Sequence, residues 1–171
     1  SRGWISISGI INTHFIGSYL LMKYGTDEQK QKYLPRMATG EIRAAFSLSE
    51  PEMGSDVQAL KTNAKKDGDF YVINGQKVFT TNGHSADLVL LACKTDPTQK
   101  AKGVSLILVE TDRAGFTRGR KLEKIGCKAQ DTSELFFSDL RVPVSNLLGT
   151  EGGGFGILMT QLAQERLIQA I

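Results

Sequence analysis

The spacing of apolar residues changes twice along this chain of 171 residues. Before Glu41 they recur every three or four positions, as they do in helices. After Glu41 they form short runs separated by turn residues, as in sheets built from many short strands. From Gly156 the helical spacing returns. This order predicts an α+β fold in which a helical segment precedes a central antiparallel β-barrel or sandwich domain and a further helix follows it.

Two helices are expected before the strands. Residues 5–23 carry apolar side chains at three- and four-residue steps and should form a largely buried helix. Thr26 suits the N-cap of the second helix, which should close at Thr39 and Gly40. Pro35 lacks the amide proton of a helix interior, so we expect it to kink this helix or to mark a restart.

The segment after Glu41 is expected to contain short strands. They cover residues 43–49, 63–66, 70–74, 76–81, 88–94, 103–110, 116–118 and 133–142. Asn74 and Gly75 stand between two of these runs as a two-residue hairpin turn, because both central positions of that turn favour positive φ. Residues 96–102 should form a polar loop and residues 112–115 a tight turn.

Composition and charge argue against several classes of function. The net charge of +3 is small and no basic run carries interleaved aromatics, so nucleic acid is not an expected partner. No apolar run approaches the roughly 20 residues of a membrane span. The scattered histidines and cysteines do not form a metal motif, and the two cysteines are expected to be reduced thiols in an intracellular compartment. The helical pattern that ends the sequence has no stop signal, which favours a longer protein cut at both ends.

The chemistry begins at residues 46–56, FSLSEPEMGSD. A strand that runs into a loop with glycine, serine and adjacent amides is suited to hold a phosphate, because glycine allows close approach and amides donate hydrogen bonds. The alternative is a solvated turn in which Pro51 and Gly54 only reverse the chain.

This segment resembles the first signature of the acyl-CoA dehydrogenase family, and further motifs follow in the family's order. They are KVFTTNG at 77–83, GVSL at 103–106, AGF at 114–116, LEKIG at 122–126, DTSELFF at 131–137, VP at 142–143, GTEGGGF at 149–155 and QERL at 164–167. The resemblance covers nearly the whole chain and is strongest to the long-chain and isovaleryl-type branch. Two residues depart from the family pattern: Met53 stands where the family usually has a small residue, and Ser47 where a smaller or apolar residue is common.

The resemblance implies a subunit of three parts. Residues 1–42 would end an N-terminal helical domain, residues 43–148 would form the flavin-binding middle β domain, and residues 149–171 would start a C-terminal helical bundle. The full-length protein would be a homo-tetramer or homo-dimer. Without the rest of that bundle, we expect the 171-residue chain by itself to fold, to be largely free of FAD and to lack dehydrogenase activity.

The cofactor that the resemblance implies is FAD. Phe46, Leu48 and Ser49 would lie along the isoalloxazine ring, and Gly54 and Ser55 would meet the pyrophosphate. The other expected contacts are Phe79 over one ring face and Thr80 and Thr81 at the N5 side. Outside this motif, Phe79 would be read as an ordinary core aromatic.

Glu165 is the expected catalytic base. Proton removal from the carbon beside a thioester needs a carboxylate near that carbon. Leu158, Leu162 and Glu165 fall on one helical stripe, where partial desolvation would favour basicity. In the long-chain and isovaleryl branch the base lies in such a Glu-Arg pair, whereas most of the family takes it from a later helix. The alternative is a structural glutamate that faces solvent or pairs with a cation.

The expected contacts to acyl-CoA come from several segments. They are Ser55, the loop with Ala101 and Lys102, Gly156, and the QERL residues Gln164, Glu165 and Arg166. Lysines in polar loops are more often simply solvated. Glu50, Asp56 and Asp131 are expected to serve turns and strand ends rather than catalysis.

The function implied is oxidation of an acyl-CoA to its trans-2-enoyl form, with electrons passing to an electron-transfer flavoprotein. The location would be intracellular, in a bacterial cytoplasm or a mitochondrial matrix. Two alternatives stay open at this point. One is an acyl-CoA oxidase, which lets oxygen reach the reduced flavin, and the other is a catalytically silent β module that only binds a partner or nucleotide.

Overall fold

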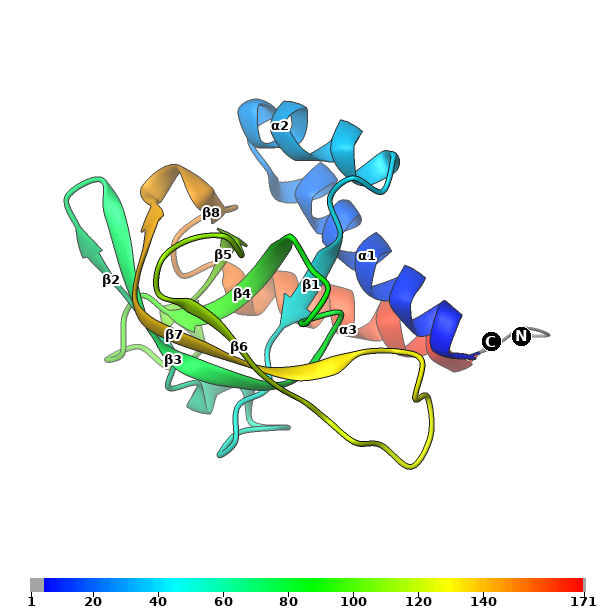
Figure 1. The fold of residues 1–171 in the computed structure, drawn as a ribbon. Helices are drawn as coiled ribbons and strands as arrows, with labels where there is room; N and C mark the ends of the chain where they lie inside the picture. The colour runs from blue at the N-terminus through cyan, green and yellow to red at the C-terminus, as the bar shows by residue number, and fades with distance from the viewer. Residues whose placement is uncertain (1–4, 171) are drawn as a thin grey trace.

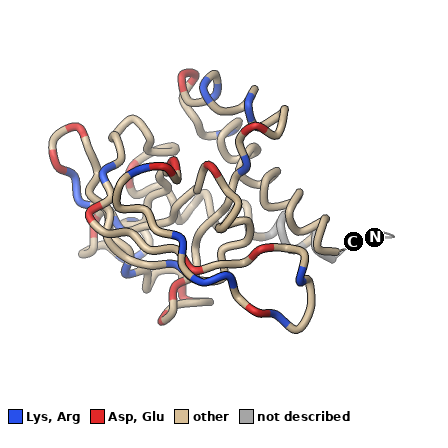
Figure 2. The backbone as a smooth tube through the Cα atoms, in the orientation of Figure 1, with Lys and Arg blue, Asp and Glu red and all other residues tan. Residues whose placement is uncertain are grey.

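The computed structural model describes residues 5–170, except for the side chains of residues 163–166 and 168–170. Three helices lie together on one side of a strongly curved sheet (Figure 1). They are α1 (Ile5–Tyr24), α2 (Asp27–Ala38) and α3 (Gly154–Ala170). Basic and acidic residues are interspersed along the chain, so neither sign dominates the view in Figure 2.

Helix α2 begins as the sequence predicts. The Thr26 side chain accepts a hydrogen bond of 3.2 Å from the Gln29 amide, and the Gln29 side chain accepts one of 3.1 Å from the Thr26 amide. This reciprocal capping box satisfies two amides at the start of the helix. The restart considered at Pro35 does not occur, because α2 is one helix through Ala38. Only the carbonyl bond of Gln31 is lost, and Gln31 is exposed.

Helix α1 is less buried than expected. Ile16, Leu20 and Leu21 are buried, but one face is exposed, with Ile7, Ile11, Phe15, Tyr19 and Met22 at 41–63% exposure. By length and composition alone this 20-residue helix is apolar enough to cross a membrane, with an 18-residue stretch of mean hydropathy 1.3, although no apolar run of that length was expected. Of that stretch, 33% is buried against the rest of the fold. His14 on α1 bonds both the Ala44 amide and the Met37 carbonyl, which ties the helix into the fold.

Eight strands form one sheet in the order β6-β7-β3-β2-β4-β5-β8, with β1 beside β4. Their bounds are β1 Ala44–Ser47, β2 Asn63–Asp67, β3 Phe70–Thr81, β4 Leu88–Lys94, β5 Val104–Glu110, β6 Phe116–Lys121, β7 Thr132–Pro143 and β8 Leu147–Leu148. Most neighbours are antiparallel, but β1 and β2 are both parallel to β4. The α+β class is confirmed, and the described strands leave the sheet open rather than closed into a barrel.

Strands β4 and β5 are buried on both faces. Leu88, Leu90 and Ala92 of β4 point into a cluster that also contains residues of all three helices. The alternate residues Val89, Leu91 and Cys93 point into a second cluster, which the sheet encloses by folding β3 and β7 over β4 and β5. Because alternate side chains of a strand point to opposite faces, an unbroken apolar run suits this central position.

Strand β3 corrects one prediction. Asn74 and Gly75 do not form a hairpin turn, because β3 continues through them and pairs with β7 on both sides. Gly75 has φ +145°, and a Cβ atom there would lie 2.6 Å from Thr62 Oγ1, so glycine is needed for close approach. The two-residue turn lies earlier, where Gly68 (φ +58°) and Asp69 connect β2 to β3.

Candidate functional site

A cleft of about 230 Å³ lies where α1, α3, β3 and the segment after β1 meet. Six of its nine lining residues have apolar or aromatic side chains, and the other three carry hydroxyl groups. The lining residues are Thr13, Ile16, Phe46, Leu48, Ser49, Val78, Phe79, Thr81 and Leu162. Pockets of this kind, apolar with a few placed polar groups, are typical of cofactor sites.

A β-bulge presents Phe79 to this cleft. In the β3–β7 ladder Lys77 pairs with Leu135 and Thr80 with Ser133, so Val78 and Phe79 together face the single residue Glu134. Phe79 has φ +55°, which is unusual for a residue with a side chain, and its side chain is 69% exposed. Bulges re-aim side chains, and an aromatic ring left this exposed is available to cover a ligand.

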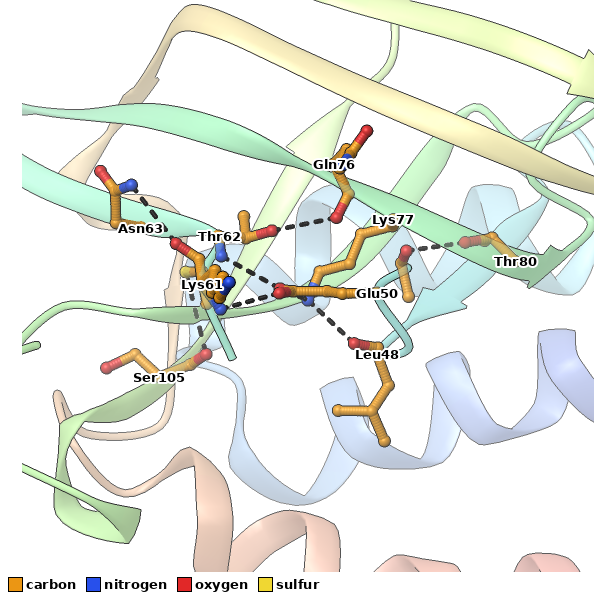
Figure 3. A network of polar contacts seen from close by, with 11 residues as sticks. Leu48, Glu50, Lys61, Thr62, Asn63, Gln76, Lys77, Thr80 and Ser105 are labelled. Atoms are coloured by element: carbon orange, nitrogen blue, oxygen red, sulfur yellow. Dashed lines mark hydrogen bonds and ion pairs between the residues drawn. The ribbon is translucent and has the colours of Figure 1, made fainter. Parts of the chain in front are cut away.

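Three hydrogen bonds join the two walls of the cleft, residues 46–49 and residues 77–81. The Val78 amide donates to the Ser49 carbonyl at 2.9 Å. Lys77 Nζ donates to the Leu48 carbonyl at 2.9 Å, and the Ser47 and Thr80 hydroxyl oxygens lie 2.8 Å apart (Figure 3). The sequence gives no sign of these bonds, because the partners are about 30 residues apart.

A buried ion pair lies behind the cleft. Lys77 Nζ donates to Glu50 Oε1 at 2.8 Å, and the amides of Lys61 and Thr62 donate to the same carboxylate at 2.7 and 3.0 Å (Figure 3). Burial raises the pKa of Glu50, but Lys77 and the amide donors outweigh it and hold that pKa below its ordinary value. Burial lowers the pKa of Lys77, and Glu50 opposes this shift. The expectation that Glu50 serves turn structure agrees with these contacts.

The structure brings together five of the eight residues expected to contact FAD. Phe46, Leu48, Ser49, Phe79 and Thr81 all line the cleft. Thr80 is buried and bonds to Ser47 instead of lining it. Thr13, Ile16 and Val78 also line the cleft, but their spacing in the sequence gives no signal for a site. Leu162, the remaining lining residue, falls on the helical stripe that also contains Glu165.

Gly54 and Ser55 lie in an exposed loop outside the cleft lining. A Cβ atom at Gly54 would meet no atom within 4 Å, so a ligand has room to approach the backbone. Among the described residues, the hydrogen bonds include none donated by the amides of Ser49, Gly54 or Ser55. The departure at Met53 is explained by packing, since Met53 is 5% exposed and belongs to the helix-side cluster.

The donor set therefore fits a planar aromatic cofactor that carries an anionic tail. Aromatic and aliphatic side chains in the cleft lining suit a flat ring, and the Ser49 and Thr81 hydroxyls in the same lining are able to bond a polar ring edge. The undonated amides of Gly54 and Ser55 suit a phosphate.

The residues expected to contact acyl-CoA lie in several separate segments and do not share one cleft, as the residues around Phe79 do. Ala101 and Lys102 lie in the short helix η2 (Ala101–Gly103), and the Lys102 carbonyl packs against Gly152 just before α3 begins. Gly156 is exposed in the first turn of α3. Gln164, Glu165 and Arg166 are helical residues of α3 whose side chains lie outside the described part of the structure. Glu165 follows the cleft residue Leu162 by three positions, about one turn.

A second polar cluster surrounds Glu110, at the end of β5. Its carboxylate accepts hydrogen bonds from Lys32 (2.7 Å), Tyr33, Arg113 (2.8 Å) and Asn146 (2.9 Å). Burial raises the pKa of Glu110, but the hydrogen bonds from Lys32, Tyr33 and Arg113 outweigh it and lower that pKa to about 2. The group is saturated with donors, which makes it a structural link between α2 and the sheet.

Neither cysteine is bonded to the other. Cys93 is fully buried, and burial raises the pKa of its thiol to about 12, while Cys127 is half-buried. Within the described part of the chain, no three His, Cys, Asp or Glu side chains gather as a metal site would require.

Helices packed on an open sheet, with a cleft lined in part by Phe46 and Phe79 where they meet, define an α+β architecture with a candidate binding site. Residues 45–140 match the acyl-CoA dehydrogenase middle domain, and residues 1–41 match the acyl-CoA dehydrogenase N-terminal domain. The chain belongs to the acyl-CoA dehydrogenase family.

Several relatives are named as acyl-CoA dehydrogenases. The long-chain specific acyl-CoA dehydrogenase of Sus scrofa mitochondria is 49% identical over 152 residues, which are 88% of this chain and 35% of that protein. The acyl-CoA dehydrogenase structure from Geobacillus kaustophilus is 58% identical with a TM-score of 0.86, over 87% of this chain and 40% of that one. The structure of butyryl-CoA dehydrogenase from Megasphaera elsdenii is 36% identical with a TM-score of 0.89, over 97% of this chain and 44% of that one. This chain therefore spans little more than a third of the curated relative's length.

Proposed function

We propose that the cleft holds the isoalloxazine ring of FAD and that the full-length protein oxidises an acyl-CoA thioester to trans-2-enoyl-CoA. The observation that carries the proposal is the exposed Phe79 ring, which a bulge presents over a cleft lined by Phe46 and Leu48. Relatives named as dehydrogenases of long-chain, isobutyryl and isovaleryl acyl-CoA support the reaction class.

Each wall of the cleft has a part in holding the cofactor. Phe79 covers one face of the ring, and Ser49 and Thr81 bond its polar edge. Gly54 and Ser55 donate their amides to the pyrophosphate. When bound, FAD supplies the acceptor for the hydride that leaves the acyl chain. Hydrogen bonds from Ser49 and Thr81 favour the electron-rich form of the ring, so these residues tune the cofactor as well as bind it.

Glu165 is the proposed catalytic base. Its position in α3, about one turn after the cleft residue Leu162, supports this role, because the cleft is the proposed site of the ring that accepts the hydride. The carboxylate takes the proton from the carbon beside the thioester carbonyl, while Gln164 and Arg166 flank the substrate. Ser55, Ala101, Lys102 and Gly156 are the further proposed contacts to acyl-CoA.

The proposed electron acceptor is an electron-transfer flavoprotein, and the proposed assembly is a homo-tetramer or homo-dimer. The relatives include mitochondrial proteins and a protein of Bacillus subtilis, which supports a location in the matrix or the bacterial cytoplasm. An oxidase is the second candidate, because a structure described as prolyl acyl carrier protein oxidase is 35% identical with a TM-score of 0.92. Oxygen consumption measured beside acceptor-dye reduction separates the two.

The cofactor is tested in the purified full-length protein. Wild type should carry flavin absorbance, and Phe79→Ala should weaken FAD affinity by about three- to tenfold, the size of an aromatic contact. Ser55→Ala should also weaken flavin retention, whereas Ser138→Ala, an exposed serine on β7, serves as the matched control. A colourless wild type that cannot be reconstituted with FAD would contradict the proposal and favour a silent binding module.

A further inference from the structure

We propose that the Ser47–Thr80 hydroxyl pair is a clasp that sets the relative position of the two cleft walls. Thr80 then acts on the bound ring as a positioning residue, without touching it. This inference rests on the proposed function, since the ring is FAD. It concerns residues that the cleft lining does not include.

Ser47 and Thr80 each stand between two residues that line the cleft. Ser47 is flanked in sequence by Phe46 and Leu48, and all three belong to one wall. Thr80 is flanked by Phe79 and Thr81 on the other wall. Both pairs of flanking residues line the cleft, while Ser47 and Thr80 point away from it and meet at 2.8 Å.

The surroundings make the clasp sensitive to the loss of one hydroxyl. Ser47 is 0% and Thr80 is 2% exposed, so water cannot replace a missing partner. A buried hydroxyl left without a partner is costly, and a shift of its backbone toward another acceptor relieves that cost. Any such shift of Ser47 or Thr80 moves two cleft residues with it.

The other two hydrogen bonds between the walls do not set the angle between them, because they lie close together. Lys77 bonds the Leu48 carbonyl and the Val78 amide bonds the Ser49 carbonyl, both at one end of the walls. The Ser47–Thr80 bond holds the other end, next to Thr81, whose hydroxyl lies at the proposed polar edge of the ring. Beyond it, the Asn82 side chain donates to the Ala44 carbonyl at 3.3 Å. The hydroxyl pair is the shorter of these two bonds and the one inside the walls, so it fixes the angle between them.

The test uses four variants of the full-length protein: Thr80→Val, Ser47→Ala, the double variant, and Thr80→Ser. Valine keeps the shape of threonine but cannot form the bond, whereas serine keeps the hydroxyl. Two measurements are made on each: FAD affinity with the absorption spectrum of the bound flavin, and backbone hydrogen exchange of residues 46–50 and 78–81 without FAD.

Thr80→Val and Ser47→Ala should each weaken FAD affinity by about three- to tenfold, the size of one neutral hydrogen bond, and shift the flavin absorption bands. The double variant should be no weaker than either single one, because both remove the same bond. Thr80→Ser should restore affinity and spectrum. Exchange should be at least about threefold faster in both walls of Thr80→Val and unchanged in Thr80→Ser.

A Thr80→Val protein with wild-type affinity and spectrum would overturn the clasp even if it were less stable. If the wild type binds no FAD, the proposed function fails, and the exchange measurement still decides the clasp. In that case, exchange at residues 46–50 that does not respond to Thr80→Val overturns it.

Discussion

Lys77 Nζ lies 2.8 Å from Glu50 Oε1, and the two side chains are 0% and 5% exposed. Removing one member of such a pair leaves a buried charge without its partner. Lys77→Met should therefore lower the free energy of unfolding by about 3–5 kcal/mol in urea titrations. Lys77→Met combined with Glu50→Gln should recover part of this loss, because no unpaired charge remains. A loss below about 1 kcal/mol for the single variant would contradict the ion pair.

Glu110 should make the stability of the fold depend on pH. Its pKa is lowered from 4.5 to about 2 in the folded state. The stabilisation is therefore complete above about pH 4.5 and is lost as the pH falls toward 2. Glu110→Gln should be less stable at pH 7 by at most about 3 kcal/mol, and the difference should shrink below pH 4. Glu41→Gln, in a surface pair with Arg36, is the control and should change stability by under about 1 kcal/mol. Parallel stability curves for wild type and Glu110→Gln would refute the prediction.

Gly75 should not tolerate a side chain. Its φ of +145° is unfavourable for other residues, and a Cβ atom would meet Thr62 at 2.6 Å. Gly75→Ala should therefore lower stability by about 1–3 kcal/mol, through strain and overpacking. Gly126→Ala is the matched control, because a Cβ atom there meets nothing within 4 Å. Thermal unfolding of the two variants side by side checks the prediction, and equal midpoints would refute it.

Glu165→Gln tests the proposed base in the full-length protein. The amide matches the carboxylate in shape but cannot accept a proton, so acyl-CoA should bind while kcat falls by at least about 100-fold. Thr160→Ala, at an exposed position of the same helix, should keep its kcat. Single-turnover flavin bleaching measures the step directly. Near-normal turnover in Glu165→Gln would place the base on another residue of the full-length protein.

The sequence predicts most elements of this fold because their signals are local. The Thr26 N-cap, the apolar runs of β4 and β5 and the polar loop after β4 all depend on neighbouring residues. Asn74 and Gly75 carry an equally local signal for a turn, but long pairing of β3 with β7 overrides it. The glycine at that point is kept for contact with Thr62, which lies outside any sequence window around it.

In the candidate site, too, the residues that belong to local motifs were predictable from the sequence, and the contacts between distant residues were not. Phe46, Ser49, Phe79 and Thr81 come from two short motifs, so the resemblance predicts them together, whereas the cleft residue Thr13 comes from α1 and was not predicted. The inward direction of Thr80 follows from a bulge, which changes the alternation of side chains in a way that composition does not reveal. The Lys77–Glu50 pair joins residues 27 positions apart, and only the folded backbone brings them together.

The placement of β4 and β5 between two apolar clusters has a consequence for unfolding. The helical layer and the folded-over strands pack on opposite faces of the same two strands, so neither can be removed without exposing side chains of that shared pair. The two clusters should therefore melt in a single cooperative transition. Amide protons of Val89 to Ala92 should exchange only when the whole chain opens, and their exchange should report the global free energy of unfolding.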